Sequence, residues 1–189
     1  MEATRILMEE HRVIERVIAS LEAGAKRLEA GQPIRVEFFI QAAEFIKGFA
    51  DGCHHRKEEG VLFPAMEAAG VAREGGPIGV MLAEHEQGRQ LTRGMRQAAE
   101  KMQAGEVSAK ADISQNALGY AALLRQHIMK EDNVLFPMAE RVIPLAKQAE
   151  IAEAFERIEH EVTGEGVHEK YLGMAEALEQ EVKVKLDRL

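Results

Sequence analysis

Tryptophan is absent from this 189-residue chain, cysteine occurs once and proline five times. A single cysteine, Cys53, cannot form a disulfide within the chain, so the fold must depend on its packed interior. We expect Cys53 to be a small buried residue, with a redox role as the alternative, and this cysteine usage fits a reducing compartment such as the cytoplasm. The length suits one domain with a sizeable core, which we place over residues 1–189.

Long hydrophobic runs and an excess of basic charge are also absent. No stretch approaches the roughly 20 apolar residues of a membrane-spanning helix, and the N-terminal residues include no apolar segment of signal-peptide length. The formal net charge is −8, with lysines and arginines interleaved among acids, whereas a nucleic-acid partner needs a basic patch. We therefore expect a cytoplasmic protein with no membrane and no nucleic-acid partner.

The residue types that are abundant favour helices. Ala, Leu, Glu, Lys, Arg, Gln and Met are common, and β-branched residues seldom follow one another. In four stretches of the chain, apolar residues recur at steps of three and four, so each stretch would bury one face as a helix. The four stretches begin near Leu7, Arg35, Ile78 and Ile113. This spacing predicts an all-α protein, an up-down four-helix bundle over about residues 4–142.

Glycine and proline mark where the predicted helices end. Breaks fall at residues 31–33, 70–77 and 105–108, and Ser108 is placed to cap the fourth helix. From about residue 145 to residue 189 the helical pattern continues, with an interruption at Gly164-Glu165-Gly166. We expect this segment to form an additional C-terminal helix, broken or kinked, that packs on the bundle.

One motif occurs twice, 73 residues apart (127 − 54 and 131 − 58). His54 and Glu58 are followed by Leu62-Phe63-Pro64, and His127 and Glu131 are followed by Leu135-Phe136-Pro137. On a helix, residues four apart lie on one face, so each copy directs an imidazole and a carboxylate to the same point. Two such helices that face each other would form a metal site.

Two further histidines, His11 and His85, lie on the buried faces of the other two predicted helices. The segments that end at them match at an offset of 74 residues (85 − 11), Leu-Met-Glu-Glu-His against Met-Leu-Ala-Glu-His, so the chain reads as a duplicated helical hairpin. One histidine on an apolar face is more often a hydrogen-bonded core residue than a ligand, but six polar groups in one core need a partner. Tyr120 and Val134 share the fourth buried face and are expected in the core.

The types of donor atom indicate which metals would bind. Imidazole and carboxylate suit iron, manganese or zinc, and the chain has no thiolate cluster. Four histidines and two glutamates overfill a tetrahedral zinc site, whereas two glutamates that bridge a pair of ions leave open coordination positions. We therefore predict a pair of iron or manganese ions, with zinc as the minority alternative, and a small molecule at the open positions.

With these residues the chain resembles the hemerythrin-like HHE cation-binding family of non-haem di-iron four-helix bundles, over about residues 4–142. The family pattern is a histidine on the first and third helices and His-x-x-x-Glu on the second and fourth. It is matched here by His11, by His54 to Glu58, by His85 and by His127 to Glu131.

One position departs from the family pattern. Oxygen-carrying hemerythrins have a second histidine four residues after the first on the third helix, and this chain has Arg89 there. We predict His55 as the missing ligand, with a solvent-facing His55 as the alternative. His168 is a further candidate ligand, with a surface histidine as the alternative.

Acidic residues near the predicted ligands have a supporting role in this interpretation. Glu59 and Asp132 are expected either to be solvated or to accept a hydrogen bond from a ligating imidazole. Glu15 is expected beside the site or at the surface.

The resemblance implies three functions. We rank first a di-iron protein that binds or senses dioxygen, nitric oxide or peroxide in a stress response, and simple oxygen carriage is disfavoured by Arg89. The alternatives are a di-iron enzyme, which would decompose peroxide or donate iron for cluster repair, and an iron-responsive interaction module. The expected partner is a small diatomic or peroxide ligand, and the sequence indicates no particular protein partner.

Overall fold

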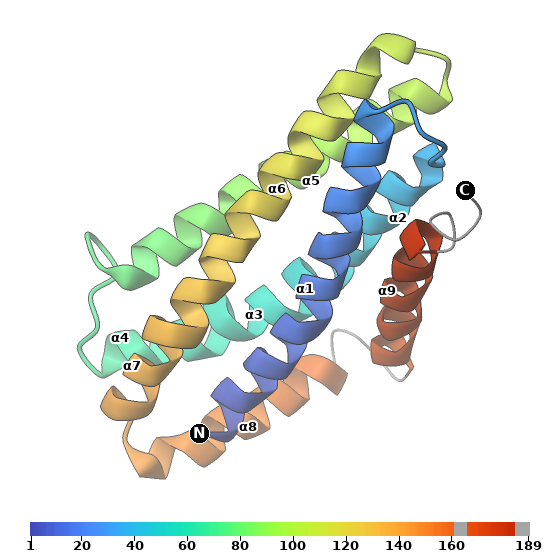
Figure 1. Cartoon of the computed structure of the whole chain (residues 1–189). Helices are drawn as coiled ribbons and strands as arrows, with labels where there is room; N and C mark the ends of the chain where they lie inside the picture. The colour runs from blue at the N-terminus through green and yellow to red at the C-terminus, as the bar shows by residue number, and fades with distance from the viewer. Residues whose placement is uncertain (161–165, 184–189) are drawn as a thin grey trace.

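The computed structural model describes residues 1–160 and 166–183, and within these ranges every regular element is a helix. Four long helical rods run alternately up and down to form a bundle (Figure 1). The first rod is α1 (Glu2–Glu29) and the third is α5 (Pro77–Gln103), and both are regular α-helices. The predicted all-α bundle is therefore confirmed.

The second and fourth rods contain π-helical turns. The second consists of α2 (Val36–Phe45), the π-helical η1 (Ile46–His54), α3 (His55–Lys57), the π-helical η2 (Glu58–Leu62) and α4 (Phe63–Ala68). The fourth consists of the 3-10 turn η3 (Val107–Ala109), α6 (Lys110–Lys130), the π-helical η4 (Glu131–Leu135) and α7 (Phe136–Val142). η2 and η4 therefore occupy the same place in the two copies of the sequence repeat.

The prolines of the repeat give a physical reason for η2 and η4. In a regular α-helix a proline ring collides with the carbonyl of the residue four positions earlier and offers no N–H to it. For Pro64 and Pro137 these carbonyls belong to Gly60 and Asn133, which lie inside η2 and η4. A π-helical turn pairs residues five apart, so it accommodates the proline while the helix continues.

Two details of the fourth rod differ from the sequence prediction. Val134 was expected in the core but is 53% exposed, and Leu135 is buried in its place. The wider π-helical turn moves the inward face by one residue, which a regular helical period cannot anticipate. The prediction for Ser108 is also wrong, because the residue lies inside η3 and the cap position of α6 is Ala109.

The C-terminal segment forms two helices, α8 (Leu145–Ile158) and α9 (Val167–Lys183). α8 lies across the end of the bundle near the start of α1, and α9 packs along α1 and α2 (Figure 1). Gly164, where we expected the break, lies outside the described residues. Gly166 directly precedes α9 with a φ of +81°, a left-handed conformation that glycine adopts without strain.

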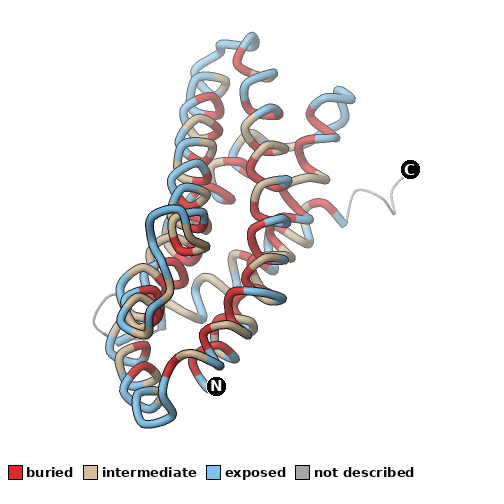
Figure 2. The backbone as a smooth tube through the Cα atoms, turned by 90° about the vertical axis from the view of Figure 1, so that its left-hand side faces the viewer, coloured by how far each residue is buried: buried red, intermediate tan, exposed pale blue. Residues whose placement is uncertain are grey.

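Buried residues follow the inner faces of the rods (Figure 2) and form two separate hydrophobic clusters. One cluster includes Ile14 of α1, and the other, nearer α8, includes Leu7 of α1. His11 lies between these two residues in the chain and belongs to neither cluster. A polar layer therefore divides the hydrophobic core.

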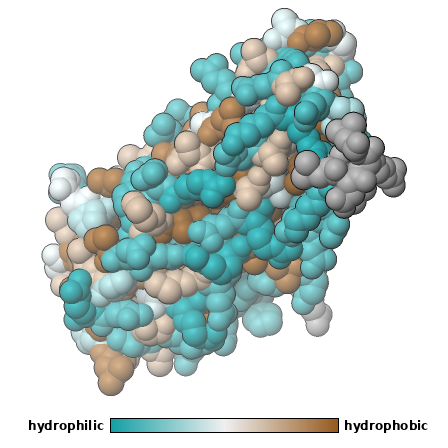
Figure 3. Space-filling model, in the orientation of Figure 1, coloured by the Kyte–Doolittle hydropathy of each residue, from teal (hydrophilic) through white to brown (hydrophobic). Residues whose placement is uncertain are grey.

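The outer surface is mainly hydrophilic on the face shown in Figure 3, with hydrophobic residues scattered among the polar ones. None of the helices in the described ranges combines the length and the apolar character that a membrane crossing requires.

Candidate metal centre

The polar layer contains five histidines and two glutamates, and each of them is at most 3% exposed. All four rods contribute to it. These residues are His11, His54, His55, Glu58, His85, His127 and Glu131. The structure thus brings together every predicted ligand except His168.

The seven side chains form two groups. Within each group the potential ligand atoms all lie within 4.8 Å of one another. The three-histidine subsite consists of His55, His85, His127 and Glu58. The two-histidine subsite consists of His11, His54, Glu58 and Glu131. Glu58 belongs to both groups.

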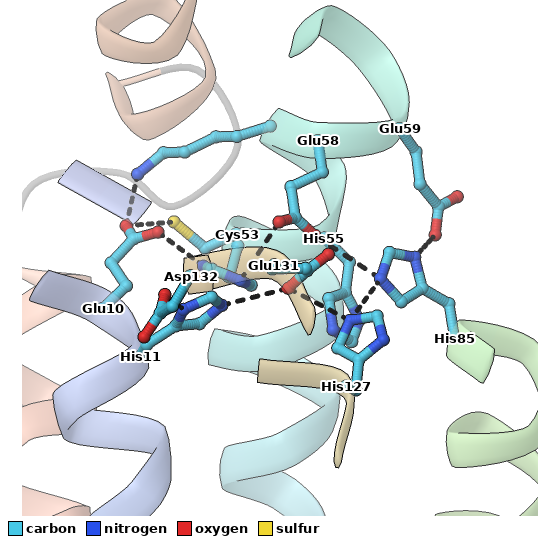
Figure 4. A network of polar contacts seen from close by, with 12 residues as sticks. Glu10, His11, Cys53, His55, Glu58, Glu59, His85, His127, Glu131 and Asp132 are labelled. Atoms are coloured by element: carbon cyan, nitrogen blue, oxygen red, sulfur yellow. Dashed lines mark hydrogen bonds and ion pairs between the residues drawn. The ribbon is translucent and has the colours of Figure 1, made fainter. Parts of the chain in front are cut away.

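The two glutamates lie between the subsites (Figure 4). The two carboxylate oxygens of Glu58 are 3.6 Å from Nε2 of His54 and 3.4 Å from Nε2 of His85. Oε2 of Glu131 is 3.2 Å from Nε2 of both His11 and His127. Each glutamate therefore faces histidines of both subsites, as bridging carboxylates do in bundles that hold two metal ions.

Every histidine of the layer is held from outside by a separate carboxylate. The contacts from Nδ1 are His11 to Asp132 at 2.7 Å, His54 to Glu10 at 2.9 Å, His55 to Asp51 at 2.9 Å, His85 to Glu59 at 2.8 Å and His127 to Glu84 at 2.9 Å. An ionised carboxylate only accepts hydrogen bonds, so Nδ1 donates and the lone pair of Nε2 points inward. The layer thus presents five inward nitrogen lone pairs.

Most of the inward atoms lack hydrogen-bond partners. Nε2 of His11, His54 and His55 and all four carboxylate oxygens of the two glutamates are buried and unpaired. Nε2 of His85 lies 3.0 Å from Nε2 of His127, so a proton or a metal cation must lie between these two nitrogen atoms. Buried acceptors without donors are costly, and cations between them would remove that cost. The donor atoms present therefore fit a pair of metal ions.

Without a bound cation, the pKa values of the buried groups determine where the site holds protons. Burial alone would lower the pKa of His127, but Glu131 and Glu84 outweigh this and raise it to about 9. Burial and neighbouring His11 lower the pKa of His54 to about 4. Burial and the charge of Glu131 raise the pKa of Glu58 well above its usual value. Protons on Glu58 and His127 thus occupy places that metal ions would take.

The site repeats across the two halves of the chain. Lys57 donates to Glu10, which holds His54, at 2.5 Å. In the second half Lys130 donates in the same way to Glu84, which holds His127. These six residues correspond at the offsets of 73 and 74 found in the sequence. The second half therefore repeats both the ligands and their supports.

His55 breaks this internal symmetry. Its ring stacks on that of His85, with centroids 3.8 Å apart, and its support is Asp51. The corresponding positions in the second half are Ile128 and Leu124, each 3% exposed. One subsite therefore has three histidines and the other has two.

The lysines differ in their surroundings. Lys57 is fully buried, with Nζ 3.5 Å from Glu159 just beyond α8, whereas the Lys130 side chain is 34% exposed.

Glu10, Cys53 and Glu159 also lie close enough to one another to hold a cation, but the Lys57 ammonium already contacts Glu10 and Glu159. Cys53 is buried, as predicted, and burial raises the pKa of its thiol to about 11.

Of the other residues named from the sequence, three lie outside the layer. His168 has a side chain 39% exposed and sits 3.6 Å from Glu159, away from the seven inward side chains. Glu15 is at the surface, paired with Arg12 at 3.1 Å. Arg89 contacts Glu59 and, at 3.5 Å, Asp51, the carboxylates that support His85 and His55.

The sequence prediction missed Glu10, Asp51 and Glu84 as supports, although it proposed that role for Glu59 and Asp132. Sequence signals were present, because a glutamate precedes the histidine in both halves, at Glu10 and at Glu84, and Asp51 lies four residues before His55. Each of these glutamates supports a histidine of another rod rather than its neighbour in the chain. Their partners follow only from how the rods are rotated about their axes.

Comparison with known proteins adds an independent observation. The family model described as the hemerythrin HHE cation binding domain matches residues 2–139. Uncharacterized protein Mb2018 of Mycobacterium bovis and Uncharacterized protein Rv1995 of Mycobacterium tuberculosis are each 30% identical over 159 residues, which are 84% of this chain and 62% of each relative. The chain thus spans less than two thirds of the length of these relatives. No solved structure matches it.

Proposed function

The chain belongs to the hemerythrin HHE cation-binding family, and we propose that it is a non-haem di-iron protein that binds or senses dioxygen, nitric oxide or peroxide. The observation that carries this proposal is the inequality of the two subsites. Both share the carboxylates of Glu58 and Glu131, but one has three histidines and the other two. A metal in the two-histidine subsite would have fewer protein ligands, and thus a coordination position for a small molecule.

Each residue of the layer has a distinct task in this proposal. Glu58 and Glu131 would bridge the two ions, and the outer carboxylates fix the orientation of the imidazoles. Iron bound there would supply exchangeable coordination and a change of oxidation state. Phe136, stacked on His11 with ring centroids 5.5 Å apart, covers one face of that imidazole with an apolar ring.

The proposal also includes a partner and a compartment. We propose a small diatomic molecule or peroxide as the partner, because the ligand side chains are almost fully buried and a large substrate could not reach them. A cytoplasmic location and a single domain over residues 1–189 complete the proposal, and a part in a stress response would follow from such reactivity.

Metal analysis with optical spectroscopy tests this function. Protein purified after growth with iron should contain about two iron ions per chain and show the charge-transfer absorption of a bridged ferric pair. Nitric oxide or peroxide should change the spectrum. Protein that takes up no metal under these conditions, or holds redox-inert zinc alone, would refute the proposed function.

A further inference from the structure

A cavity of about 510 Å³ opens between the π-helical segment η1 and helix α5. Its lining includes four cationic side chains, and the acidic residue in that lining is Asp51. The four cations are Lys47, Arg89, Arg93 and Arg96. This concentration of positive charge contrasts with the net charge of −8 of the whole chain.

The three arginines of the cavity have acidic partners that an incoming anion could replace. Arg89, Arg93 and Arg96 lie on one face of α5, at spacings of four and three residues, where like charges repel. The acids that pair with Arg93 and Arg96 are Glu86 and Glu100, on α5 itself, and both are 51% exposed. Exposed pairs of this kind are weak, so another anion can replace them.

Lys47 faces the arginines from the other wall of the cavity. It lies on η1, is exposed and forms no ion pair with any other residue that the structure describes. The cavity thus combines cations from two rods, which a helix surface alone would not provide.

We propose that this cavity binds a small oxyanion of the phosphate type, either as the free ion or as the phosphate group of a compact metabolite. Guanidinium groups match the oxygens of phosphate through paired hydrogen bonds. The cavity lining contains no aromatic side chain on which a nucleobase would stack, which disfavours a nucleotide. Its volume leaves room for a few carbon atoms beyond the phosphate.

Arg89 connects this cavity to the candidate metal centre. It contacts Asp51 and Glu59, which accept hydrogen bonds from His55 and His85 of the three-histidine subsite. An anion that binds Arg89 competes with these two carboxylates and so changes how they hold the imidazoles. This second part of the inference rests on the proposed function, whereas binding of the anion does not.

Calorimetric titration with inorganic phosphate at low ionic strength tests the binding. We compare the wild type with the double variant R93Q/R96Q and with a control, R125Q/R141Q, which removes the same charge at exposed positions outside the cavity. Wild type and control should bind one phosphate per chain, and affinity should fall at least about tenfold in R93Q/R96Q, as for charge-assisted contacts. Absence of saturable binding, or equal affinities in all three proteins, would overturn the inference.

Two further arms separate the sources of the anion and the role of the metal. Glycerol 3-phosphate should compete with phosphate for the cavity, and tighter binding of the ester identifies a phosphorylated metabolite rather than the free ion. Phosphate bound directly to the metal would survive in R93Q/R96Q and would therefore contradict the cavity site. Protein that takes up no metal after growth with iron, yet still binds phosphate, would refute the proposed function and leave the cavity site intact.

The optical spectrum tests the connection to the metal centre. Phosphate at the concentration that half-saturates the wild type should shift the spectra of the metal-loaded wild type and control, and should shift that of R93Q/R96Q much less. Phosphate that occupies the cavity without any spectral shift would overturn the connection through Arg89.

Discussion

At the scale of single residues, His55 determines how the two subsites differ. Replacing it with isoleucine, the residue at the corresponding position of the second half, makes the two subsites alike. In His55→Ile we expect the affinity for one of the two ions to fall at least about tenfold, because one of three imidazoles is lost. Competition titrations with a metal indicator measure this. His168→Ala, which removes a histidine outside the layer, is the control and should change neither affinity.

The opposite substitution tests where the small molecule binds. Ile128→His offers a third imidazole to the two-histidine subsite and should occupy its open coordination position. We expect two ions per chain as before, with little or no spectral response to nitric oxide. A response as large as that of the wild type would place the open position elsewhere.

Proton competition gives a prediction on pH. With a pKa of about 9 in the metal-free protein, His127 carries a proton at pH 7, and a metal ion must displace it. Loading should therefore release protons, and metal affinity should rise as the pH increases from 7 towards 9. Proton release is measured with a pH indicator in weak buffer. Metal uptake at pH 7 without proton release would show that His127 is neutral or is not a ligand.

The sequence predicted the inward residues more completely than their supports. His54 and His127 were identified from the repeat, since spacing along one helix determines which face a residue occupies. Asp51, four residues before His55 on the same rod, was overlooked, whereas Glu84 was missed because its contact crosses to another rod. Spacing along one helix does not specify how two rods are rotated against each other.

At the scale of helical elements, the π-helical turns set the register of the glutamates. A regular helical period predicted Val134 in the core, and the wider turn of η4 buries Leu135 instead. The sequence did contain the cause, because proline follows each of these turns at Pro64 and Pro137. The period of the pattern alone could not show whether proline would end the helix or widen it.

Removing a proline tests this account of the turn. In Pro137→Ala the restored N–H can bond the carbonyl of Asn133, so η4 can relax towards a regular α-helix. We expect helical content to be retained and metal affinity to fall about tenfold, because Glu131 at the start of η4 changes its direction. Circular dichroism and metal titration measure the two effects. The same substitution at Pro144, which lies outside the turn, is the control and should leave metal affinity unchanged.

At the scale of the whole molecule, the polar layer divides the core and must be satisfied for the bundle to be stable. Metal binding to the folded state alone adds about 3 kcal/mol at a hundredfold excess over Kd. For a chain of this size that raises Tm by roughly 6–12 °C. Calorimetry with and without chelator measures the difference. Equal Tm values would mean that the layer is satisfied by protons alone.

The C-terminal helices extend the bundle beyond the matched family segment, which ends at residue 139. Phe155 of α8 is buried near Lys57, and the Lys57 ammonium lies 6.0 Å from the centre of its ring. This cover explains why Lys57 is buried while Lys130 is partly exposed. The sequence indicated a helical extension, but not that it shields one side of the metal centre.

The central claim is that this bundle holds two ions in unequal subsites that share Glu58 and Glu131. Anomalous diffraction at the iron edge, from crystals of protein purified after growth with iron, tests it most directly. We predict two anomalous peaks, one among His55, His85 and His127 and the other between His11 and His54. A single peak, or none within the polar layer, would contradict the account.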